Sequence, residues 1–314
     1  MNDSQLPLVS VPVITYNSSK TVVETLDSIY NQTYPNLELI VSDDCSTDNT
    51  VQVCRDWIEA HKDRFVRTEL LTVEKNIGIS ANCNRAERAC QGEWAKGIAG
   101  DDLLLPDCVS DYVDYVKKNP DAIYVFGKVQ FFGSPTGDYS AHEATFDYSF
   151  FSLTPEEQLH KLVFERNYIP APSCFNNVVK VRDMGLSGCD ERVKLQEDYA
   201  KWIKLLKAGC KFHFMDKEMV RYRVNGISNG EMLSPSYVAD CIRFDLYYRY
   251  PEWCEHSESY AVERLVEQQL ETYKSYVAVA EDYARICDST AYRIGVFVLK
   301  PYRFVKRLWG KLEK

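Results

Sequence analysis

The sequence predicts an α/β fold with a mostly parallel central sheet flanked by helices. Between residues 8 and 100, short apolar runs alternate with amphipathic helical segments in the order β-α-β-α-β-α-β. This alternation is typical of a doubly wound, Rossmann-like sheet. The chain has 314 residues, of which 45% are hydrophobic and 26% charged, so one large domain or two ordinary ones with a substantial core are expected.

The spacing of apolar residues places the first elements in order. Strands are expected at residues 8–16, 37–42, 67–76 and 93–100, and the helices between them begin near residues 18, 48 and 79. Ser18 or Ser19 is expected to cap the first helix and Asp48 the second, because short polar side chains accept hydrogen bonds from free N–H groups. Gly92 is expected to close the third helix.

The pattern is looser after residue 106. The expected elements are a helix at 108–120, a strand at 122–132, a loop at 133–153, a helix at 154–165, a strand at 174–181, a helix at 195–209, a strand at 210–215 and a helical region at 234–289. Thr154 is a favourable cap and Pro155 suits a first helical position, so the helix start at 154 is well marked.

Composition and charge exclude several classes of protein. The formal net charge of −9 argues against a nucleic-acid partner. The 11 cysteines form no C-x-x-C pair, which predicts free thiols in a reducing cytosol rather than a zinc site or a disulfide framework. We find neither a secretory signal pattern at the N-terminus nor an apolar run of about 20 residues, so a cytoplasmic location is expected.

The C-terminal segment at residues 298–314 is basic and amphipathic. Phe304, Leu308 and Leu312 follow helical spacing, and six Lys or Arg residues oppose one Glu from position 300 onward. A helix of this kind can lie in an anionic membrane surface, here the inner face of the membrane. Docking of the same apolar face on the body of the protein is the alternative.

Pairs of carboxylates follow two of the predicted strands. Asp43 and Asp44 end the second strand, and Asp101 and Asp102 end the fourth. Ligands of doubly wound sheets bind at the carboxyl ends of the strands. Adjacent carboxylates are costly unless a cation neutralises them, which favours a divalent-metal site for a nucleoside diphosphate. The plainer alternative for Asp101 and Asp102 is a turn or helix cap.

Other phosphate- and metal-binding motifs are absent. Neither G-x-G-x-x-G nor G-x-x-x-x-G-K-[ST] occurs, so the dinucleotide fingerprint and the P-loop are excluded. The segment after Asp44 resembles part of a calcium loop, but the positions that require Gly and Glu hold Asn49 and Arg55.

Three blocks in this order and spacing resemble family 2 glycosyltransferases with the GT-A fold. They are the segment from Val9 to Thr50, "NIGISANCNRA" from Asn76 and "GDDLLLPD" from Gly100, and the likeness covers about residues 6–230. The resemblance implies a nucleotide-binding half at 1–105 and an acceptor-binding half at 106–230. The helical pattern that follows predicts a C-terminal helical region at 231–314. Within this family, the chain resembles enzymes of bacterial polysaccharide assembly.

The resemblance implies a donor site for a UDP-sugar. Its residues would be Thr15, Tyr16, Asn17, Asp43, Asp44, Asn76, Gly78, Asn82, Asp101 and Arg223, with Asp44 the closest match to the aspartate that reads uracil. Asp102 would ligate Mn²⁺ or Mg²⁺ on the diphosphate. The family often has His where this chain has Asn225, which puts a contribution from that position in doubt.

The resemblance also implies a catalytic base. The turn "GCDE" from Gly188 precedes "QED", in which Asp198 matches the base and Glu197 would contact the acceptor. An inverting transfer of a hexosyl or N-acetylhexosaminyl group to a glycan or lipid-linked acceptor is expected. Acidic residues are also ordinary in a helical first turn.

Two rival functions remain. One is a non-catalytic sugar-nucleotide or glycan-binding protein. The other is a metal-dependent nucleotidyltransferase, which should carry a basic Gly-rich loop where this chain has "TYNSSKT".

Overall fold

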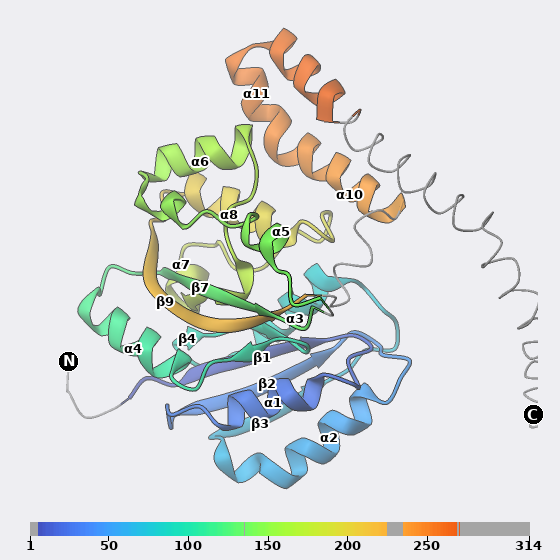
Figure 1. Ribbon diagram of the computed structural model, residues 1–314, viewed down its shortest axis with the longest axis vertical. Helices are drawn as coiled ribbons and strands as arrows, with labels where there is room; N and C mark the ends of the chain where they lie inside the picture. The colour runs from blue at the N-terminus through green and yellow to red at the C-terminus, as the bar shows by residue number, and fades with distance from the viewer. Residues whose placement is uncertain (1–5, 135, 225–234, 269, 271–314) are drawn as a thin grey trace, which may run out of the picture.

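The computed structural model describes residues 6–134, 136–224, 235–268 and 270, and its strands form one curled sheet (Figure 1). The strands are β1 (Val9–Thr15), β2 (Leu37–Asp43), β3 (Arg67–Leu71), β4 (Trp94–Ala95), β5 (Ile98–Ala99), β6 (Leu103–Leu104), β7 (Tyr124–Phe132), β8 (Phe175–Asn177) and β9 (Phe212–Arg223). Their order is β3-β2-β1-β4-β8-β7-β9-β6, and β5 also pairs with β1.

Helices cover both faces of this sheet. The α-helices are α1 (Val22–Tyr30), α2 (Thr50–His61), α3 (Ile79–Ala89), α4 (Cys108–Lys118), α5 (Ser140–Glu143), α6 (Pro155–Phe164), α7 (Val178–Asp183), α8 (Glu197–Lys207), α10 (Pro235–Phe244) and α11 (Tyr250–His256). A π-helical segment, η4 (Asp245–Arg249), joins α10 to α11. Short 3₁₀ turns are η1 (Lys62–Arg64), η2 (Tyr148–Ser152) and η3 (Ala171–Ser173).

Strand β2 shows why the sheet must be covered on both sides. All seven of its residues are buried, and successive side chains point to opposite faces. Leu39 and Val41 belong to the core beneath α1 and α2, whereas Ile40 packs in a separate cluster with Cys90 near the end of α3. A strand buried on both faces is typical of a doubly wound sheet, which confirms the predicted fold class.

The sheet is more mixed than the sequence predicts. β1, β2 and β3 are parallel, but β8 is antiparallel to both β4 and β7, and β6 is antiparallel to β9. The strand expected at 93–100 is two short strands, separated at Lys96 and Gly97. The strand expected at 174–181 turns into α7 after Asn177, and β9 runs to Arg223 rather than ending near residue 215.

Helix starts were predicted with mixed success. The side chain of Thr154 accepts the N–H of Glu157 and Pro155 is the first residue of α6, as expected. The prediction of Ser18 or Ser19 as the cap of α1 is wrong, because α1 begins after Thr21. The residue at the cap position of α2 is Asn49, although the Asp48 carboxylate does accept the Thr50 N–H at 3.0 Å.

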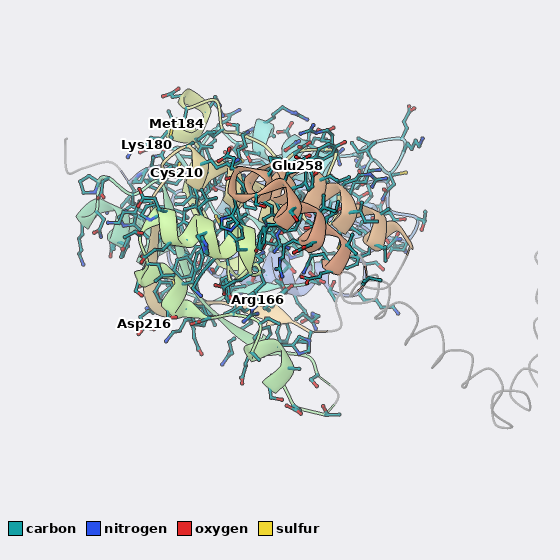
Figure 2. The ribbon with its side chains drawn as sticks, turned by 90° about the horizontal axis from the view of Figure 1, so that it is seen from above. Arg166, Lys180, Met184, Cys210, Asp216 and Glu258 are labelled. Carbon is teal, nitrogen blue, oxygen red and sulfur yellow. The ribbon has the colours of Figure 1, made fainter. Side chains whose placement is uncertain are left out.

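A second core lies between β7 and the C-terminal helices. Tyr124 and Phe126 of β7 pack with Trp202 of α8, and Phe244 and Trp253 complete the same cluster. Figure 2 views the molecule from the side that these helices cover, with Glu258 in the foreground. Helices α10 and α11 therefore belong to the same core as α8 and β7.

Some of the predictions concern segments that the structure describes only in part. The helical pattern predicted for 234–289 is confirmed as far as residue 268, and the basic segment at 298–314 lies outside the described residues. Within the described ranges, no helix is long and apolar enough to cross a membrane. The ten cysteines of those ranges are all free thiols.

Candidate active site

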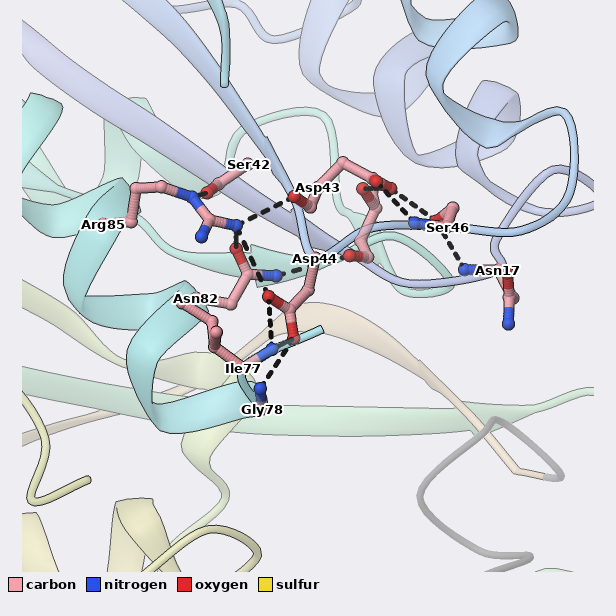
Figure 3. Close-up of polar contacts among 10 residues, drawn as sticks. Asn17, Ser42, Asp43, Asp44, Ser46, Ile77, Gly78, Asn82 and Arg85 are labelled. Carbon is pink, nitrogen blue, oxygen red and sulfur yellow. Dashed lines mark hydrogen bonds and ion pairs between the residues drawn. The ribbon is translucent and has the colours of Figure 1, made fainter. Parts of the chain in front are cut away.

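The Asp43 carboxylate joins the ends of β1 and β2 (Figure 3). It is fully buried, and it accepts the hydroxyl of Thr15 at 2.8 Å and the N–H and hydroxyl of Ser46 at 2.8 and 2.5 Å. Asn17 follows with a φ of 53° and donates its N–H to the Ser46 hydroxyl. Asp43 thus shapes the loops at the carboxyl edge of the sheet.

Asp44 binds the start of α3. Its Oδ2 accepts the N–H groups of Gly78 and Ile77 at 2.8 and 3.1 Å, and the side chain is 2% exposed. A carboxylate is favourable at a helix N-terminus, where free N–H groups carry partial positive charge. Gly78 has a φ of 97°, a conformation that glycine adopts readily. The predicted donor residues Asp44 and Gly78 are thus brought together.

Arg85 was missed by the sequence analysis and organises this acidic edge. Its guanidinium donates to the Ser42 hydroxyl at 2.9 Å, the Asp43 carbonyl at 2.8 Å and Oδ1 of Asn82 at 2.7 Å, and it lies 3.7 Å from the Asp44 carboxylate. Its position about one helical turn after Asn82, a predicted donor residue, is the signal by which the sequence could have revealed it. Arg85 therefore brings a positive charge, only 16% exposed, to the Asp44 carboxylate and the end of β2.

Asp101 and Asp102 lie at the same edge, between β5 and β6. Asp102 is 1% exposed, and its Oδ1 accepts the backbone N–H of Arg223 at 2.8 Å. The Arg223 side chain donates to the Asp101 carbonyl at 2.7 Å and to Glu24 of α1 at 2.7 Å, and its guanidinium stacks 4.3 Å from the Phe132 ring. Arg223 therefore braces the loop that carries both aspartates.

The chemistry of Asp102 fits a ligand of Mg²⁺ or Mn²⁺. Burial and the neighbouring Asp101 hold the pKa of the Asp102 carboxyl well above its usual range. A divalent cation would relieve this unfavourable charge, and hard cations prefer carboxylate oxygens. Among the described residues, no group of three or more His, Cys, Asp or Glu side chains could hold a metal alone. The donor diphosphate would have to supply further oxygens, as is usual for Mg²⁺.

Glu197 and Asp198 begin α8. The Asp198 carboxylate accepts the N–H of Tyr199 at 2.7 Å and the side-chain amide of Asn167 at 3.3 Å. Burial raises the pKa of Asp198. Burial and the Asp198 charge together raise the pKa of Glu197 well above its usual range. Two adjacent carboxyl groups with different environments are a recurrent arrangement for acid and base roles.

Helix α3 connects the acidic edge to the turn before α8. Asn84 donates to the Cys189 carbonyl at 3.0 Å and accepts the Cys189 N–H at 2.6 Å, and the Ser80 hydroxyl donates to the Val193 carbonyl at 2.6 Å. Lys201 of α8 forms an ion pair with Glu87 at 3.0 Å. The helix that starts at the Asp44 carboxylate therefore also positions the segment that leads to Asp198.

Gly188 gives a first test of this turn. Its φ is 78°, and an added Cβ would meet Oδ1 of Asn84 at 3.0 Å. Gly188→Ala is expected to lower the free energy of unfolding by about 1–2 kcal/mol for backbone strain, with a further loss from the displaced Asn84. Gly185→Ala is the matched control, because Gly185 has a φ of 69° and nothing within 4 Å of the added Cβ. Equal losses in urea unfolding would contradict a role for the Asn84 contact.

The remaining predicted donor residues lie around the same edge. Asn82 is 3% exposed and donates to the Thr15 carbonyl at 3.3 Å, whereas Asn76 is exposed and Tyr16 is 37% exposed. Buried members of the predicted set hold the loops in place, and exposed members face solvent where a nucleotide could approach. Asn225 lies outside the described residues.

The chain is similar in sequence to known glycosyltransferases. The sequence model of glycosyl transferase family 2 matches residues 10–175. A putative teichuronic acid biosynthesis glycosyltransferase, TuaG of Bacillus subtilis, is 25% identical over 229 residues, covering 72% of this chain and 83% of that protein. Chondroitin synthase of Escherichia coli is 35% identical over 116 residues, covering 37% of this chain but only 16% of that protein.

Solved structures share the fold. TarS of S. aureus in complex with UDP-GlcNAc has a TM-score of 0.60 and 20% identity, covering 86% of this chain and 73% of that one. The mannosyltransferase PcManGT of Pyrobaculum calidifontis, with GDP-Man and Mn²⁺, has a TM-score of 0.55 and 20% identity, covering 98% of this chain and 89% of that one. With a family match over more than half of its length and the GT-A fold, this chain belongs to the family 2 glycosyltransferases and is a glycosyltransferase.

Proposed function

We propose that this glycosyltransferase moves a sugar from a UDP-sugar to a hydroxyl group of a glycan or lipid-linked acceptor, with inversion at the anomeric carbon. The observation that carries the proposal is the connection through α3: one end binds Asp44 at the donor edge, and its side chains hold the turn that leads to Asp198. The proposed donor site and the proposed base would thereby be linked through one helix. TarS binds UDP-GlcNAc and PcManGT binds GDP-Man, which supports a nucleotide-sugar donor.

Asp198 is the proposed general base. Its carboxylate would take the proton of the acceptor hydroxyl as that oxygen forms a bond to the anomeric carbon and the bond to the diphosphate breaks. Glu197, whose pKa is raised by burial and by the Asp198 charge, would contact the acceptor beside the base. Asn167 orients the Asp198 carboxylate from the loop after α6.

Asp102 is the proposed metal ligand, and Asp101 supports it. The Mn²⁺ or Mg²⁺ ion would act as a Lewis acid for the charge that develops on the leaving diphosphate. Arg223 holds the backbone of Asp101 and the carboxylate of Asp102 in place through its side chain and its N–H. The Mn²⁺ in the PcManGT complex supports a divalent ion in this fold.

A donor screen tests the proposal. Nucleotide release would be measured for UDP-GlcNAc, other UDP-sugars and GDP-mannose, with and without Mn²⁺ and with water or simple sugars as acceptors. We expect release of UDP from at least one UDP-sugar, dependent on Mn²⁺ or Mg²⁺, and no release of pyrophosphate. Exclusive turnover of GDP-mannose would refute the uridine preference, and release that survives EDTA would refute the metal.

A further inference from the structure

The helix α10 lies against the start of α8. The Asp240 carboxylate, on α10, accepts three backbone N–H groups from the residues just before that helix: Lys194 at 2.8 Å, Leu195 at 2.6 Å and Gln196 at 3.2 Å. Asp240 is 1% exposed, so these bonds are made away from bulk water. Hydrogen bonds that involve an ionised acceptor are about twice as strong as neutral ones.

This contact holds the segment that leads into α8, just before the first turn of the helix. Gln196 occupies the cap position of α8 and its side chain makes no capping hydrogen bond. Backbone N–H groups that are shielded from water need hydrogen-bond acceptors. Asp240 supplies the acceptor from a segment 44 to 46 positions further along the chain. The two residues that follow Gln196 are Glu197 and Asp198.

Other side chains of the C-terminal helices contact the same segment. The Gln196 amide donates to the Tyr237 hydroxyl at 3.2 Å, and the Tyr248 hydroxyl donates to Asp190 at 2.9 Å. The rings of Tyr199 and Phe244 lie 4.3 Å apart. Contacts from α10 and η4 therefore hold the chain before and after residues 194–196, where it leads into α8.

We infer that Asp240 is a positioning residue for the transfer reaction, which sets the direction of Asp198 by fixing the backbone of residues 194–196. This inference rests on the proposed role of Asp198 as the base. It assigns the helices beyond residue 234 a part in catalysis, although the family match ends at residue 175. A displacement of about 1 Å at a reacting group can cost about 100-fold in rate.

Asp240→Asn tests the inference, with Asp245→Asn as the matched control. An Asn side chain keeps one acceptor oxygen but presents an NH₂ group in place of the other, so at least one of the three N–H groups loses its acceptor with little change in volume. Asp245 lies one helical turn and a half further on, is 5% exposed, and binds Arg249 at 3.4 Å within its own helical segment. The control therefore removes an equally buried charge whose partner is not the start of α8.

Two measurements on the full chain separate positioning from general destabilisation. We expect Asp240→Asn to lower kcat for UDP release from the UDP-sugar that the screen selects by at least about 10-fold, with the Kd of UDP unchanged within about twofold. Hydrogen exchange of the amides at 194–199 should also become faster. Asp245→Asn should keep kcat per folded molecule within about twofold and leave that exchange unchanged.

Each outcome has a distinct meaning. Unchanged exchange at 194–199 in Asp240→Asn, or equal losses of kcat in both variants, would overturn the positioning role. If exchange becomes faster and kcat falls, while Asp198→Asn transfers sugar normally, Asp240 does fix residues 194–196 but the base is not Asp198. That result would refute the proposed function of Asp198 and separate it from the behaviour of Asp240.

Discussion

Asp198→Asn is expected to lower the rate of sugar transfer by about 10²–10⁴-fold, the usual contribution of a general base. The Asn side chain has the same shape and still accepts the N–H of Tyr199 through its oxygen, so the start of α8 should stay intact. It cannot take a proton from the acceptor hydroxyl. The Kd of UDP, measured by calorimetry, should change by less than about twofold, because the proposed UDP site lies at the edge formed by β1 and β2.

The pH dependence of kcat/KM gives a second measure of the same group. The base acts only when ionised, so the rate rises with pH through its pKa. Burial raises the pKa of Asp198, so the acid limb should lie above the ordinary Asp value of about 4. Asp198→Asn should lose this limb. Asp216→Asn is the control, since Asp216 is a surface carboxylate on β9 that is 74% exposed and pairs with Lys128. A normal rate in Asp198→Asn, or a limb that persists in it, would exclude Asp198 as the base.

Asp102→Asn is the second large effect, with an expected loss of about 10²–10³-fold in transfer. A bound divalent ion contributes several kcal/mol to stabilising a developing charge, and each 1.36 kcal/mol corresponds to a factor of ten. The Asn oxygen can still accept the Arg223 N–H, so the loop should keep its conformation. The gain in UDP affinity on adding Mn²⁺ should disappear in the variant.

The control for this experiment lies in the same segment. Asp107 is exposed and accepts the Thr33 hydroxyl at 2.9 Å. Asp107→Asn should retain both the transfer rate and the effect of Mn²⁺ on UDP affinity. Should Asp102→Asn respond to Mn²⁺ as the unmodified chain does, the assignment of the metal to Asp102 would have to be abandoned.

The sequence predicts those parts of the fold that have local signals. The alternation of buried strands and helices up to residue 100 is confirmed, as are the start of α6 at Thr154 and the position of α8 before Gly209. Carboxylates at the ends of two parallel strands meet at one edge because the topology of such sheets requires it. The block from Asp43 and the pair at Asp101 could therefore be placed from sequence alone.

Parts of the site that depend on distant partners could not be predicted. Arg85 and Asp240 look like ordinary charged residues of amphipathic helices, and only the packing of α3 and α10 shows which backbone groups they bind. The antiparallel pairing of β8 and the length of β9 have the same origin, since a strand is extended by its neighbours in the sheet. Asp43, a predicted donor residue, is fully buried, and a buried carboxylate needs hydrogen-bond donors. Thr15 and Ser46 supply them, which the sequence does not reveal.

The bond between Asp102 and Arg223 has a consequence for biosynthesis. These residues are 121 positions apart in the chain, and β9, which ends at Arg223, joins the sheet between β7 and β6. Pairings of this kind close large loops and form slowly. At about 5–20 residues per second, the ribosome needs roughly 6–24 s to reach Arg223 after Asp102 has been added. The strands β1 to β3 can therefore pair early on the ribosome, while the proposed metal site is among the last features of the enzyme to be completed.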